Sequence, residues 1–541
     1  MKTILTSLLL LFFSIGSGQW TNNYSVNTLV SNSITNIQST IGTKDGRTYI
    51  VYWDETAGAN NYKLKLQLLD ANGNKMFGDN GMILNNMASM SSFVLTDDLC
   101  VDADNNLYYV FTESGGNEGK AYLHKVSPQG SQLFGNNGVV ISNGGYAPKI
   151  KLLNNNGFII SWTDRFMKYN SNGTKAWTNP VIIPTPTQGS DTINVGEISI
   201  LHDNSFVIIF HVSSGGIDSN LWAQKYNIQT GASLWNAPIK LSNKVTHSNT
   251  RYSTAVDGSI VYIGYFTYDP ILLRFDSFLQ KINSNGSLPW GINGSDFATT
   301  NQFNEGPGSI IMDSSGFIWS SLTIANSDQK EFGLAVQKFN KETGARQLSD
   351  GSKIIFPVSL NSKVMNGKIQ LLNEKPLLLF REAYDTGIDP VKYGLTYLDG
   401  NGMFIWPQQY QYIATSPTYK TSGSITEIVN SKCVITWTED RGQGSRAFAQ
   451  SFKIEGNLNT KDIVSRKFRI YPNPVKDFLN IMSDEDIKSV SLFDLSGKNI
   501  MKTVLSGNKK IDVSSLIPGG YLINIELKNG TVKTDKILKV K

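Results

Sequence analysis

Acidic side chains recur where short apolar runs of the chain end, and these are the residues best placed to do chemistry. Runs such as 49–53 and 158–162 are rich in aromatic and β-branched residues, and each stops at a carboxylate. The acids of this kind are Asp54, Glu55, Glu113, Asp164, Asp269, Glu382, Glu439 and Asp440, with Arg165, Arg381 and Arg441 adjacent to three of them. Gathered on one surface, they could hold a cation, a sugar or a basic peptide, and two at a suitable separation could cleave a glycosidic bond.

A simpler explanation of the same acids is that strands stop where polar turn residues begin. The sequence contains no Gly-x-Ser-x-Gly, His-Glu-x-x-His, Cys-x-x-Cys or phosphate-loop motif. Its four histidines, at positions 124, 202, 211 and 247, have no metal-ligand spacing. We therefore predict no catalytic residue, metal or cofactor. The predicted ligand-binding residues are Asp54, Glu113, Asp164, Arg165, Asp269, Glu382, Glu439, Asp440 and Arg441.

A repeated unit must position these acids. Eight apolar strands begin near residues 49, 108, 158, 206, 261, 317, 377 and 434, at intervals of about 50 to 60 residues. In most units the next strand runs into an Asn/Gly turn, because a tight antiparallel turn needs positive φ at its centre. An aromatic residue follows the turn glycine by four positions at Phe77, Phe134, Trp177, Trp235, Trp290 and Trp406, and Leu348 takes its place once. Because this aromatic recurs, we expect it to belong to the core of each unit.

Four antiparallel strands per unit are typical of a β-propeller blade. The eighth unit stops after its third strand, near Gly456, whereas Trp20 and the run 27–30 precede the first complete unit. We predict that this N-terminal run supplies the missing strand and closes the ring. The sequence therefore predicts an all-β protein with a propeller over residues 19–456, of eight blades, with seven as the alternative. The acidic strand ends would then share one face with the loops that usually bind ligands.

The composition agrees with an all-β fold, since 48 glycines separate short apolar runs and only 17% of the residues are charged. The net charge of +5 is not gathered into basic blocks, so nucleic acid is a poor partner. Two cysteines, Cys100 and Cys433, are too few for a disulfide framework, and we expect buried thiols.

The first 18 residues resemble no part of the repeat. Lys2, an apolar run over 4–13 and small residues up to Gly18 are typical of a secretory signal peptide cut between Gly18 and Gln19. This run falls short of the roughly 20 apolar residues that span a bilayer. No later segment is long or apolar enough either, so we expect no transmembrane span in the mature protein.

The C-terminal residues 466–541 change in character. Short alternating strands separated by Pro, Gly and Asn turns predict a small Ig-like β-sandwich. Its recurring features are a Tyr-Pro-Asn-Pro opening, an Asp-Leu-Ser-Gly-Lys turn, a Gly-Gly-Tyr strand and a basic last strand. The residues that carry them are Tyr471, Pro472, Asn473, Pro474, Gly497, Gly519, Gly520, Tyr521 and Lys536.

In this order these features resemble the type A C-terminal sorting domain of proteins exported by the type IX secretion system of Bacteroidetes. The resemblance implies that the secretion machinery is a partner, and that the domain directs passage across the outer membrane to the cell surface or the medium. It also implies removal of the domain, with residues 457–465 as the exposed linker, and release of the cargo or its attachment to lipopolysaccharide. More weakly, the segments 221–225, 437–441 and 447–450 resemble repeats of uncharacterised surface propellers.

These observations leave three functions open. The first is binding or adhesion to glycan or protein ligands through the loop face. The second is an exported carbohydrate-active hydrolase or lyase that uses the carboxylates of that face. The third is a structural component of the cell surface or of the gliding apparatus.

Overall fold

The computed structural model describes two compact units, 1–454 and 455–541, which are treated separately. The described residues are 20–21, 23–58, 62–90, 96–113, 119–155, 157–186, 191–213, 218–247, 252–359, 363–383, 390–454, 468–483, 486–494, 496–504, 510–528 and 532–540. All regular elements among them are β-strands. The predicted signal peptide and linker lie outside the described residues.

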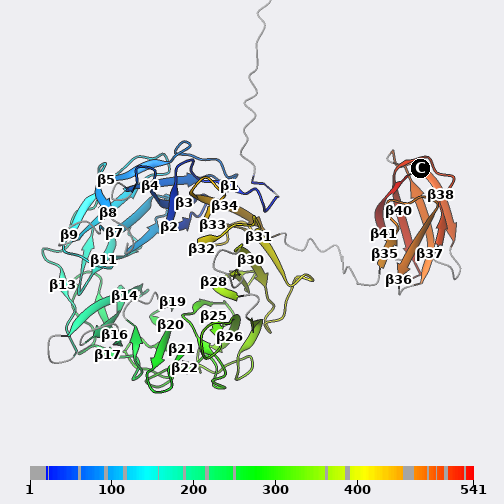
Figure 1. The fold of residues 1–541 in the computed structure, drawn as a ribbon. Helices are drawn as coiled ribbons and strands as arrows, with labels where there is room; N and C mark the ends of the chain where they lie inside the picture. Colours follow the sequence, from blue (N-terminus) through cyan, green and yellow to red (C-terminus); the bar gives the residue numbers. More distant parts are fainter. Residues whose placement is uncertain are drawn as a thin grey trace, which may run out of the picture. The chain divides into compact units, whose positions relative to one another are not determined.

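Unit 1 is a ring of eight antiparallel sheets, which we number as blades in chain order (Figure 1). Blade 1 contains β2 (Thr35–Gly42), β3 (Thr48–Asp54), β4 (Tyr62–Leu69) and β5 (Met82–Met90). Blade 2 contains β6 (Asp97–Val101), β7 (Leu107–Thr112), β8 (Lys120–Val126) and β9 (Val139–Asn143). Blade 3 contains β10 (Lys149–Leu152), β11 (Phe158–Trp162), β12 (Arg165–Tyr169) and β13 (Val181–Ile182). Blade 4 contains β14 (Thr192–Ile200), β15 (Ser205–Ser213), β16 (Asp218–Asn227), β17 (Ile239–Lys240) and β18 (Thr246–His247).

The second half of the ring repeats this order. Blade 5 contains β19 (Ser253–Asp257), β20 (Ile260–Asp269), β21 (Arg274–Ile282) and β22 (Ser295–Asp296). Blade 6 contains β23 (Asn304–Glu305), β24 (Ser309–Met312), β25 (Phe317–Ala325), β26 (Phe332–Asn340) and β27 (Lys353–Ser359). Blade 7 contains β28 (Lys363–Leu372), β29 (Lys375–Ala383), β30 (Lys392–Tyr397) and β31 (Tyr410–Ala414). Blade 8 contains β32 (Lys420–Ile425), β33 (Lys432–Asp440), β34 (Ser445–Lys453) and, from the other end of the chain, β1 (Thr28–Leu29).

The ring closes as predicted. In blade 8, Thr28 pairs with Ala449 and Leu29 with Phe448 in antiparallel register. The backbone N–H of Val30 adds a hydrogen bond of 2.9 Å to the carbonyl of Ala447. The eight-blade prediction is therefore confirmed, and the two ends of the propeller sequence share one sheet, in which β1 pairs with β34 as the outermost strand.

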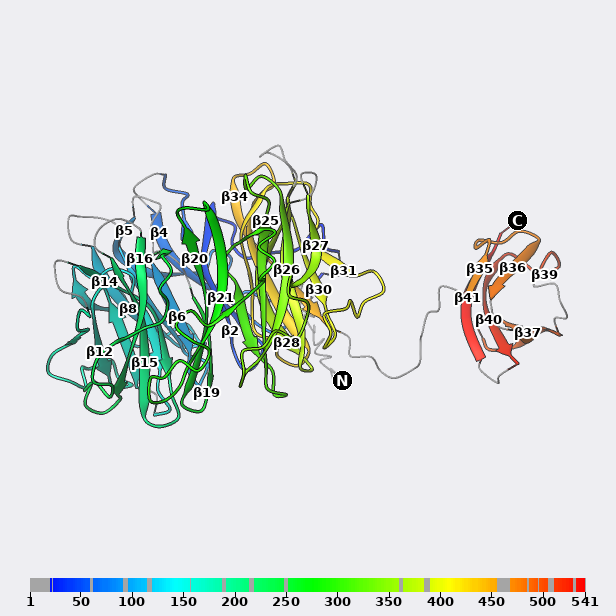
Figure 2. The ribbon, with the colours of Figure 1, turned by 90° about the horizontal axis from the view of Figure 1, so that it is seen from below.

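The eight inner strands line the middle of the ring. Contacts run from β2 through β6, β10, β14, β19, β24, β28 and β32 back to β2. Figure 2 shows the blades from the side, with their strands crossing the thickness of the ring. Hydrophobic clusters fill the spaces between neighbouring blades; one, for example, joins Tyr49, Val51 and Leu66 of blade 1 to Tyr109 and Phe111 of blade 2. The core is thus a series of such layers around the ring.

The aromatic residue that follows each Asn/Gly turn packs on the turn glycine of the next blade. A Cβ added to Gly173 would lie 3.0 Å from the ring of Phe134, and one added to Gly286 would lie 3.2 Å from Trp235. The indole N–H of Trp235 also donates to the carbonyl of Ser284 at 3.1 Å. These aromatics therefore pack between neighbouring blades, with Trp235 a buried member of a core cluster and Phe77 and Phe134 packed against two others. The prediction that they belong to the core is confirmed.

Unit 2 is a small β-sandwich. One sheet contains β35 (Phe468–Tyr471), β36 (Phe478–Ser483) and β39 (Lys510–Asp512). The other contains β37 (Ile487–Phe493), β38 (Asn499–Val504), β40 (Gly519–Leu527) and β41 (Val532–Lys539). Leu479 and Ile511 from the first sheet and Leu492, Ile523 and Ile525 from the second form a common core. This is the predicted Ig-like sandwich.

Candidate functional site

The predicted acids all stand at or next to the ends of the second strands of their blades. Asp54 ends β3, Asp269 ends β20 and Asp440 ends β33, whereas Glu113 and Asp164 directly follow β7 and β11. Because these strands run in the same direction in every blade, their ends reach one face, which we call the loop face. This face also carries the connections between successive blades.

Three of these acids are buried and interact inside their own blades. The carboxylate of Asp54 pairs with Lys65 at 2.6 Å; burial alone would raise its pKa, but hydrogen bonds from Lys65 and Thr56 lower the pKa overall. Glu113 accepts a hydrogen bond of 3.4 Å from the hydroxyl of Tyr122, and burial raises the pKa of Glu113. The hydroxyl of Tyr412 donates to Glu382. In each case the carboxylate is held by the blade itself.

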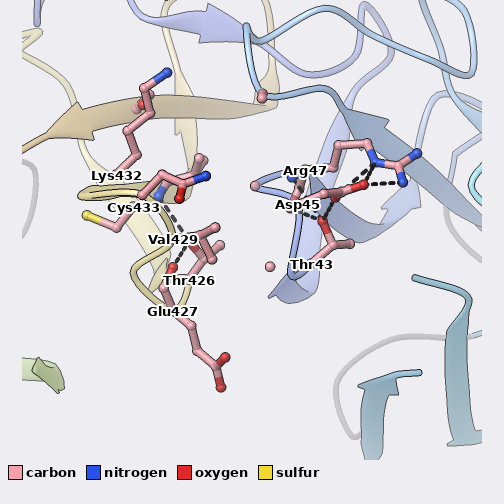
Figure 3. A pocket seen from close by; sticks show the side chains of 14 residues that line it. Thr43, Asp45, Arg47, Thr426, Glu427, Val429, Lys432 and Cys433 are labelled. Carbon is pink, nitrogen blue, oxygen red and sulfur yellow. Dashed lines mark hydrogen bonds and ion pairs between the residues drawn. The ribbon is translucent and has the colours of Figure 1, made fainter. Parts of the chain in front are cut away.

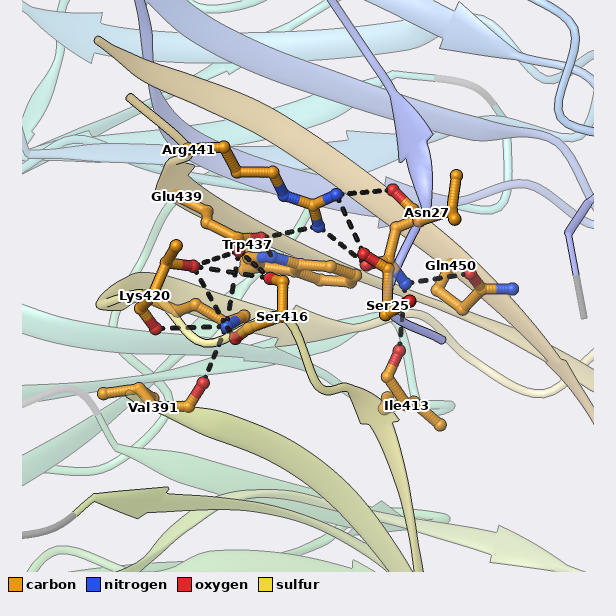
Figure 4. A network of polar contacts seen from close by, with 12 residues as sticks. Ser25, Asn27, Val391, Ile413, Ser416, Lys420, Trp437, Glu439, Arg441 and Gln450 are labelled. Carbon is orange, nitrogen blue, oxygen red and sulfur yellow. Dashed lines mark hydrogen bonds and ion pairs between the residues drawn. The ribbon is translucent and has the colours of Figure 1, made fainter. Parts of the chain in front are cut away.

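Glu439 lies at the centre of a buried network (Figure 4). Its side chain is fully buried, and it accepts hydrogen bonds from the hydroxyls of Ser416 and Thr418 and, at 2.8 Å, from the indole of Trp437. The ammonium of Lys420 lies 3.4 Å away. Burial alone would raise the pKa of Glu439, but the hydrogen bonds around it lower the pKa to about 2. The charged carboxylate is thus satisfied by groups of the protein.

Arg441 connects this network to the N-terminal segment. Its guanidinium donates to Glu439 at 2.9 Å, to the carbonyls of Ser25 and Val26 at 3.0 and 2.7 Å, and to Oδ1 of Asn27 at 2.8 Å (Figure 4). The amide of Asn27 in turn donates to the carbonyl of Ile413 and to Oε1 of Gln450. Glu439 and Arg441 therefore hold the segment that closes the ring.

The remaining predicted residues are more exposed, and each interacts within its own loop. Asp164 and Arg165 pair with each other at 2.8 Å. Asp269 accepts hydrogen bonds from the backbone of the following turn, at 271 and 272, and these lower its pKa. Asp440 accepts from the backbone N–H of Gly442 at 2.7 Å. The acids thus share a face but lie in separate loops.

Sequence reasoning missed a polar cavity between the inner strands of six blades. It has a volume of about 560 Å³, within the ~300–1,000 Å³ typical of small-molecule sites. Serines, glycines and a few charged groups form most of its wall. The lining residues are Ile37, Gln38, Ser39, Thr40, Asp97, Asp98, Leu99, Tyr252, Ser253, Gly308, Ser309, Gly367, Lys368, Ser422, Gly423 and Ser424. A signal was present in the sequence, since Gly-Ser or Gly-Lys recurs at 308–309, 367–368 and 423–424.

The two acids of this cavity bond to the surrounding strands. Asp97 accepts hydrogen bonds from Nε2 of Gln38, at 3.0 Å, and from the hydroxyl of Ser39. Asp98 accepts from the backbone N–H of Ile150 of the next blade at 3.0 Å. These hydrogen bonds connect neighbouring strands, so Asp97 and Asp98 stabilise the wall of the cavity.

A second, smaller cavity of about 90 Å³ lies where blade 8 meets blade 1, beside the turns that connect their first and second strands (Figure 3). Asp45 and Arg47 form an ion pair on one side, and Glu427 and Lys432 stand on the other. Cys433 also contributes to the wall, and burial raises the pKa of its thiol to about 12. The other cysteine, Cys100, is partly buried. Neither thiol is poised to react as a thiolate.

The histidines and the remaining titratable groups form no metal site among the described residues. His124 and His211 are buried in the blades, and Nε2 of His211 contacts the hydroxyl of Tyr252 at 2.6 Å. One further acid was missed by sequence reasoning, because its burial depends on the packing of two blades. Glu305 is only 3% exposed, and burial raises its pKa to about 9, although the backbone N–H of Ser277 donates to it at 2.9 Å.

In unit 2 the predicted sorting residues connect the two ends of the sandwich. The side chain of Asn473 donates to the carbonyl of Lys536 at 2.8 Å and accepts from the backbone N–H of Leu538 at 2.9 Å. Gly497 completes a turn with φ of 87°, in which Asp494 accepts backbone hydrogen bonds. The hydroxyl of Tyr521 donates to the carbonyl of Ile517. The Tyr-Pro-Asn-Pro opening is thereby fastened to the last strand.

Residues 469–540 match the family described as the secretion system C-terminal sorting domain. Unit 2 is a type IX sorting domain. The chain is therefore a cargo of the type IX secretion system, delivered to the cell surface or the extracellular space. None of the curated proteins gives a significant match. No described helix is long and apolar enough to cross a membrane.

Several solved structures are similar to the chain at low identity. Prolyl oligopeptidase B from Galerina marginata, bound to a 25mer macrocyclization substrate, is 13% identical, with a TM-score of 0.41; the match covers 76% of this chain and 56% of that one. A polysaccharide lyase is 9% identical over 82% of this chain and 93% of its own, with a TM-score of 0.39. The GH93 α-L-arabinofuranosidase of Fusarium graminearum is 7% identical over 68% and 96%, with a TM-score of 0.34. These TM-scores are low, and the propeller assignment rests on the sheet topology.

Proposed function

We propose that the exported propeller is a non-enzymatic binding protein that takes a hydrophilic ligand, a glycan, in its central cavity. The observation that carries this proposal is the composition of the cavity wall. Five serines, a threonine and a glutamine stand among the lining residues, together with three glycines that leave backbone groups accessible. Sugars are recognised by such hydroxyl, amide and backbone groups, held in place by a rigid scaffold.

The state of the acids favours binding over hydrolysis. A glycosidase needs one carboxylic acid that donates a proton and one carboxylate that acts as base or nucleophile. Asp97 and Asp98, which line the cavity, both accept hydrogen bonds from the protein. The predicted loop-face acids are either buried within their blades or in separate loops. As part of this proposal, the exposed Asp164, Arg165, Asp269 and Asp440 form a rim that a long glycan or a protein ligand could contact.

An array of oligosaccharides and polysaccharides, probed with the chain from Gln19 onward and followed by product analysis, tests this function. We expect binding without turnover, and we expect it to weaken at least tenfold when Ser253 and Ser309 are both replaced by valine. The double replacement Ser314→Ala with Ser349→Ala, outside the cavity wall, is the control. Release of shortened products would indicate a hydrolase, and release of unsaturated products would indicate a lyase, in place of a binding protein. If no glycan binds, the proposal is wrong, and the remaining functions are binding to a protein ligand and a structural role at the cell surface.

A further inference from the structure

We infer that Lys368 makes the central cavity selective for anionic sugars, which deepens and rests on the proposed glycan binding. Lys368 stands in the middle of β28, immediately after a β-bulge between Asn366 and Lys368. The bulged residue is Gly367, where an added Cβ would lie 2.9 Å from the side chain of Leu379. Only glycine allows this close approach, and bulges of this kind re-aim the neighbouring side chain. Gly367 and Lys368 both line the cavity.

The charge of Lys368 is not neutralised by an ion pair. Its ammonium makes no hydrogen bond or ion pair with the described residues, and Glu427 acts on it only as a more distant charge. Lys151, on another inner strand, differs in this respect because it pairs with Glu197 at 2.9 Å. The side chain of Lys368 is exposed to the cavity, and partial desolvation without an ion-pair partner lowers its pKa. An anion that entered the cavity would supply this partner.

Hydroxyl groups flank this lysine on both neighbouring strands. Ser309 belongs to β24, and Ser422 and Ser424 belong to β32, and both strands contact β28. All three serines line the same cavity as Lys368. One ammonium with hydroxyl donors beside it suits a singly charged group, such as the carboxylate of a uronic acid or a sulfate ester. The remaining serine and backbone groups of the cavity suit the hydroxyls of the same sugar.

The acids of the cavity do not cancel this preference. Asp97 accepts hydrogen bonds from Gln38 and Ser39, and Asp98 accepts one from the backbone N–H of Ile150. Lys151 lies close enough to Asp98 for the two charges to interact. Both acids belong to β6, whereas Lys368 is the only charged residue among those that β24, β28 and β32 contribute to the described lining, so the positive charge is local to this part of the wall.

Calorimetric titration of the chain from Gln19 onward tests this inference with three probes of equal length, namely a neutral galactan, a galacturonan and a sulfated galactan oligosaccharide. We expect at least one anionic probe to bind tenfold or more tightly than the neutral one, and this advantage to shrink in 0.5 M NaCl. The two anionic probes distinguish a carboxylate from a sulfate ester. In K368Q the advantage should fall to less than twofold, whereas binding of the neutral probe should persist.

The matched control is K375Q, because Lys375 is exposed in the adjacent strand β29 and lies outside the cavity wall. Thermal unfolding of both variants establishes that they fold, and K368M provides a second removal of the charge without the amide. Equal binding of neutral and anionic probes, or an anionic preference that survives in K368Q and K368M, would overturn the role of Lys368. If none of the three probes binds, the proposed glycan binding fails, and the inference that rests on it fails too.

Discussion

The pKa of Glu305 shows how strongly burial between two blades can change the protonation of a single residue. Glu305 begins blade 6 but accepts a hydrogen bond from Ser277 of blade 5, so its carboxyl is enclosed between two blades. Burial raises its pKa to about 9, and the nearby Asp296 and Asp276 add to this effect. At neutral pH the folded protein therefore holds a proton at Glu305 that the unfolded chain releases.

This proton makes the stability of the propeller depend on pH. The pKa is raised on folding, so the native state binds more protons than the unfolded state between about pH 4.5 and 9, and stability falls as pH rises through this window. Each rise of one pH unit within this window lowers the free energy of unfolding by up to about 1.4 kcal/mol. We expect Glu305→Gln, which keeps the acceptor for Ser277, to raise the melting temperature at pH 8 and to change it little at pH 5. Glu331→Gln, at a partly exposed site, is the control; an equal change in the melting temperature of Glu305→Gln at pH 5 and at pH 8 would contradict the assignment.

The individual acids were easier to locate in the sequence than to interpret. Their position at strand ends followed from the alternation of apolar runs and polar turns. However, the sequence does not reveal that Lys65 neutralises Asp54 or that Arg441 reaches Glu439 and the backbone of Ser25. Such partners come from another strand or from the other end of the chain, so they follow only from the three-dimensional packing.

At the scale of the elements, the contact between each turn glycine and the preceding blade's aromatic recurs around the ring. The turn at Gly286 has φ of 86°, and its lack of a side chain lets Trp235 lie directly against the backbone. The same arrangement recurs from Trp20 on Gly73 to Trp290 on Gly344. The periodicity of glycine and aromatic residues in the sequence is thus the periodicity of the blade interfaces.

The contribution of this glycine–aromatic contact to stability can be measured separately from the effect of backbone strain, by comparing two glycines. Gly258 also has positive φ, of 62°, but an added Cβ would meet nothing within 4 Å. We expect Gly258→Ala to cost about 1 kcal/mol, because a side chain disfavours this conformation. Gly286→Ala should cost about 1–3 kcal/mol more, since it also displaces Trp235. Chemical denaturation measures both free energies of unfolding, and equal losses would mean that the aromatic contact contributes nothing.

The order of the strands was predictable from the sequence, whereas the cavity was not. Period-two runs and Asn/Gly turns repeat often enough to define the blades, and the incomplete eighth unit indicated where the ring closes. The inner strands that line the cavity have bulges or register shifts at Ile37–Ser39, Asn366–Lys368 and Thr421–Ser424. A bulge adds one residue without breaking the apolar pattern strongly, so its effect on side-chain direction becomes visible only in the paired strands.

For the molecule as a whole, Arg441 is the main polar connection between the beginning and the end of the propeller sequence. It joins Glu439 to three consecutive residues, 25–27, immediately before β1. We expect Arg441→Gln to destabilise the propeller by about 2 kcal/mol or more, because it removes the guanidinium partner of buried Glu439 and the donor to the carbonyls of Ser25 and Val26. Arg165→Gln, which removes only a local ion pair, should cost less than about 0.5 kcal/mol.

Thermal unfolding and limited proteolysis of these two variants locate the effect. Faster cleavage between residues 20 and 30 in Arg441→Gln, with Arg165→Gln unchanged, is the expected pattern. An unaltered cleavage rate and melting temperature in Arg441→Gln would show that the pairing of β1 with β34 closes the ring without this clamp.

The two compact units have separate roles: the sandwich carries the sorting signal, and we propose that the propeller carries the binding site. Deletion of residues 466–541 should therefore leave a folded propeller in the periplasm, whereas the full chain reaches the cell surface or the medium. Fractionation of cells that express either form measures the distribution, and protease resistance of the periplasmic form shows that the propeller has folded. Asn473→Ala, which removes both side-chain hydrogen bonds to the last strand, should reduce export several-fold, since the opening motif would no longer be fastened to β41. Normal delivery of the truncated chain would instead place the export signal within residues 1–465.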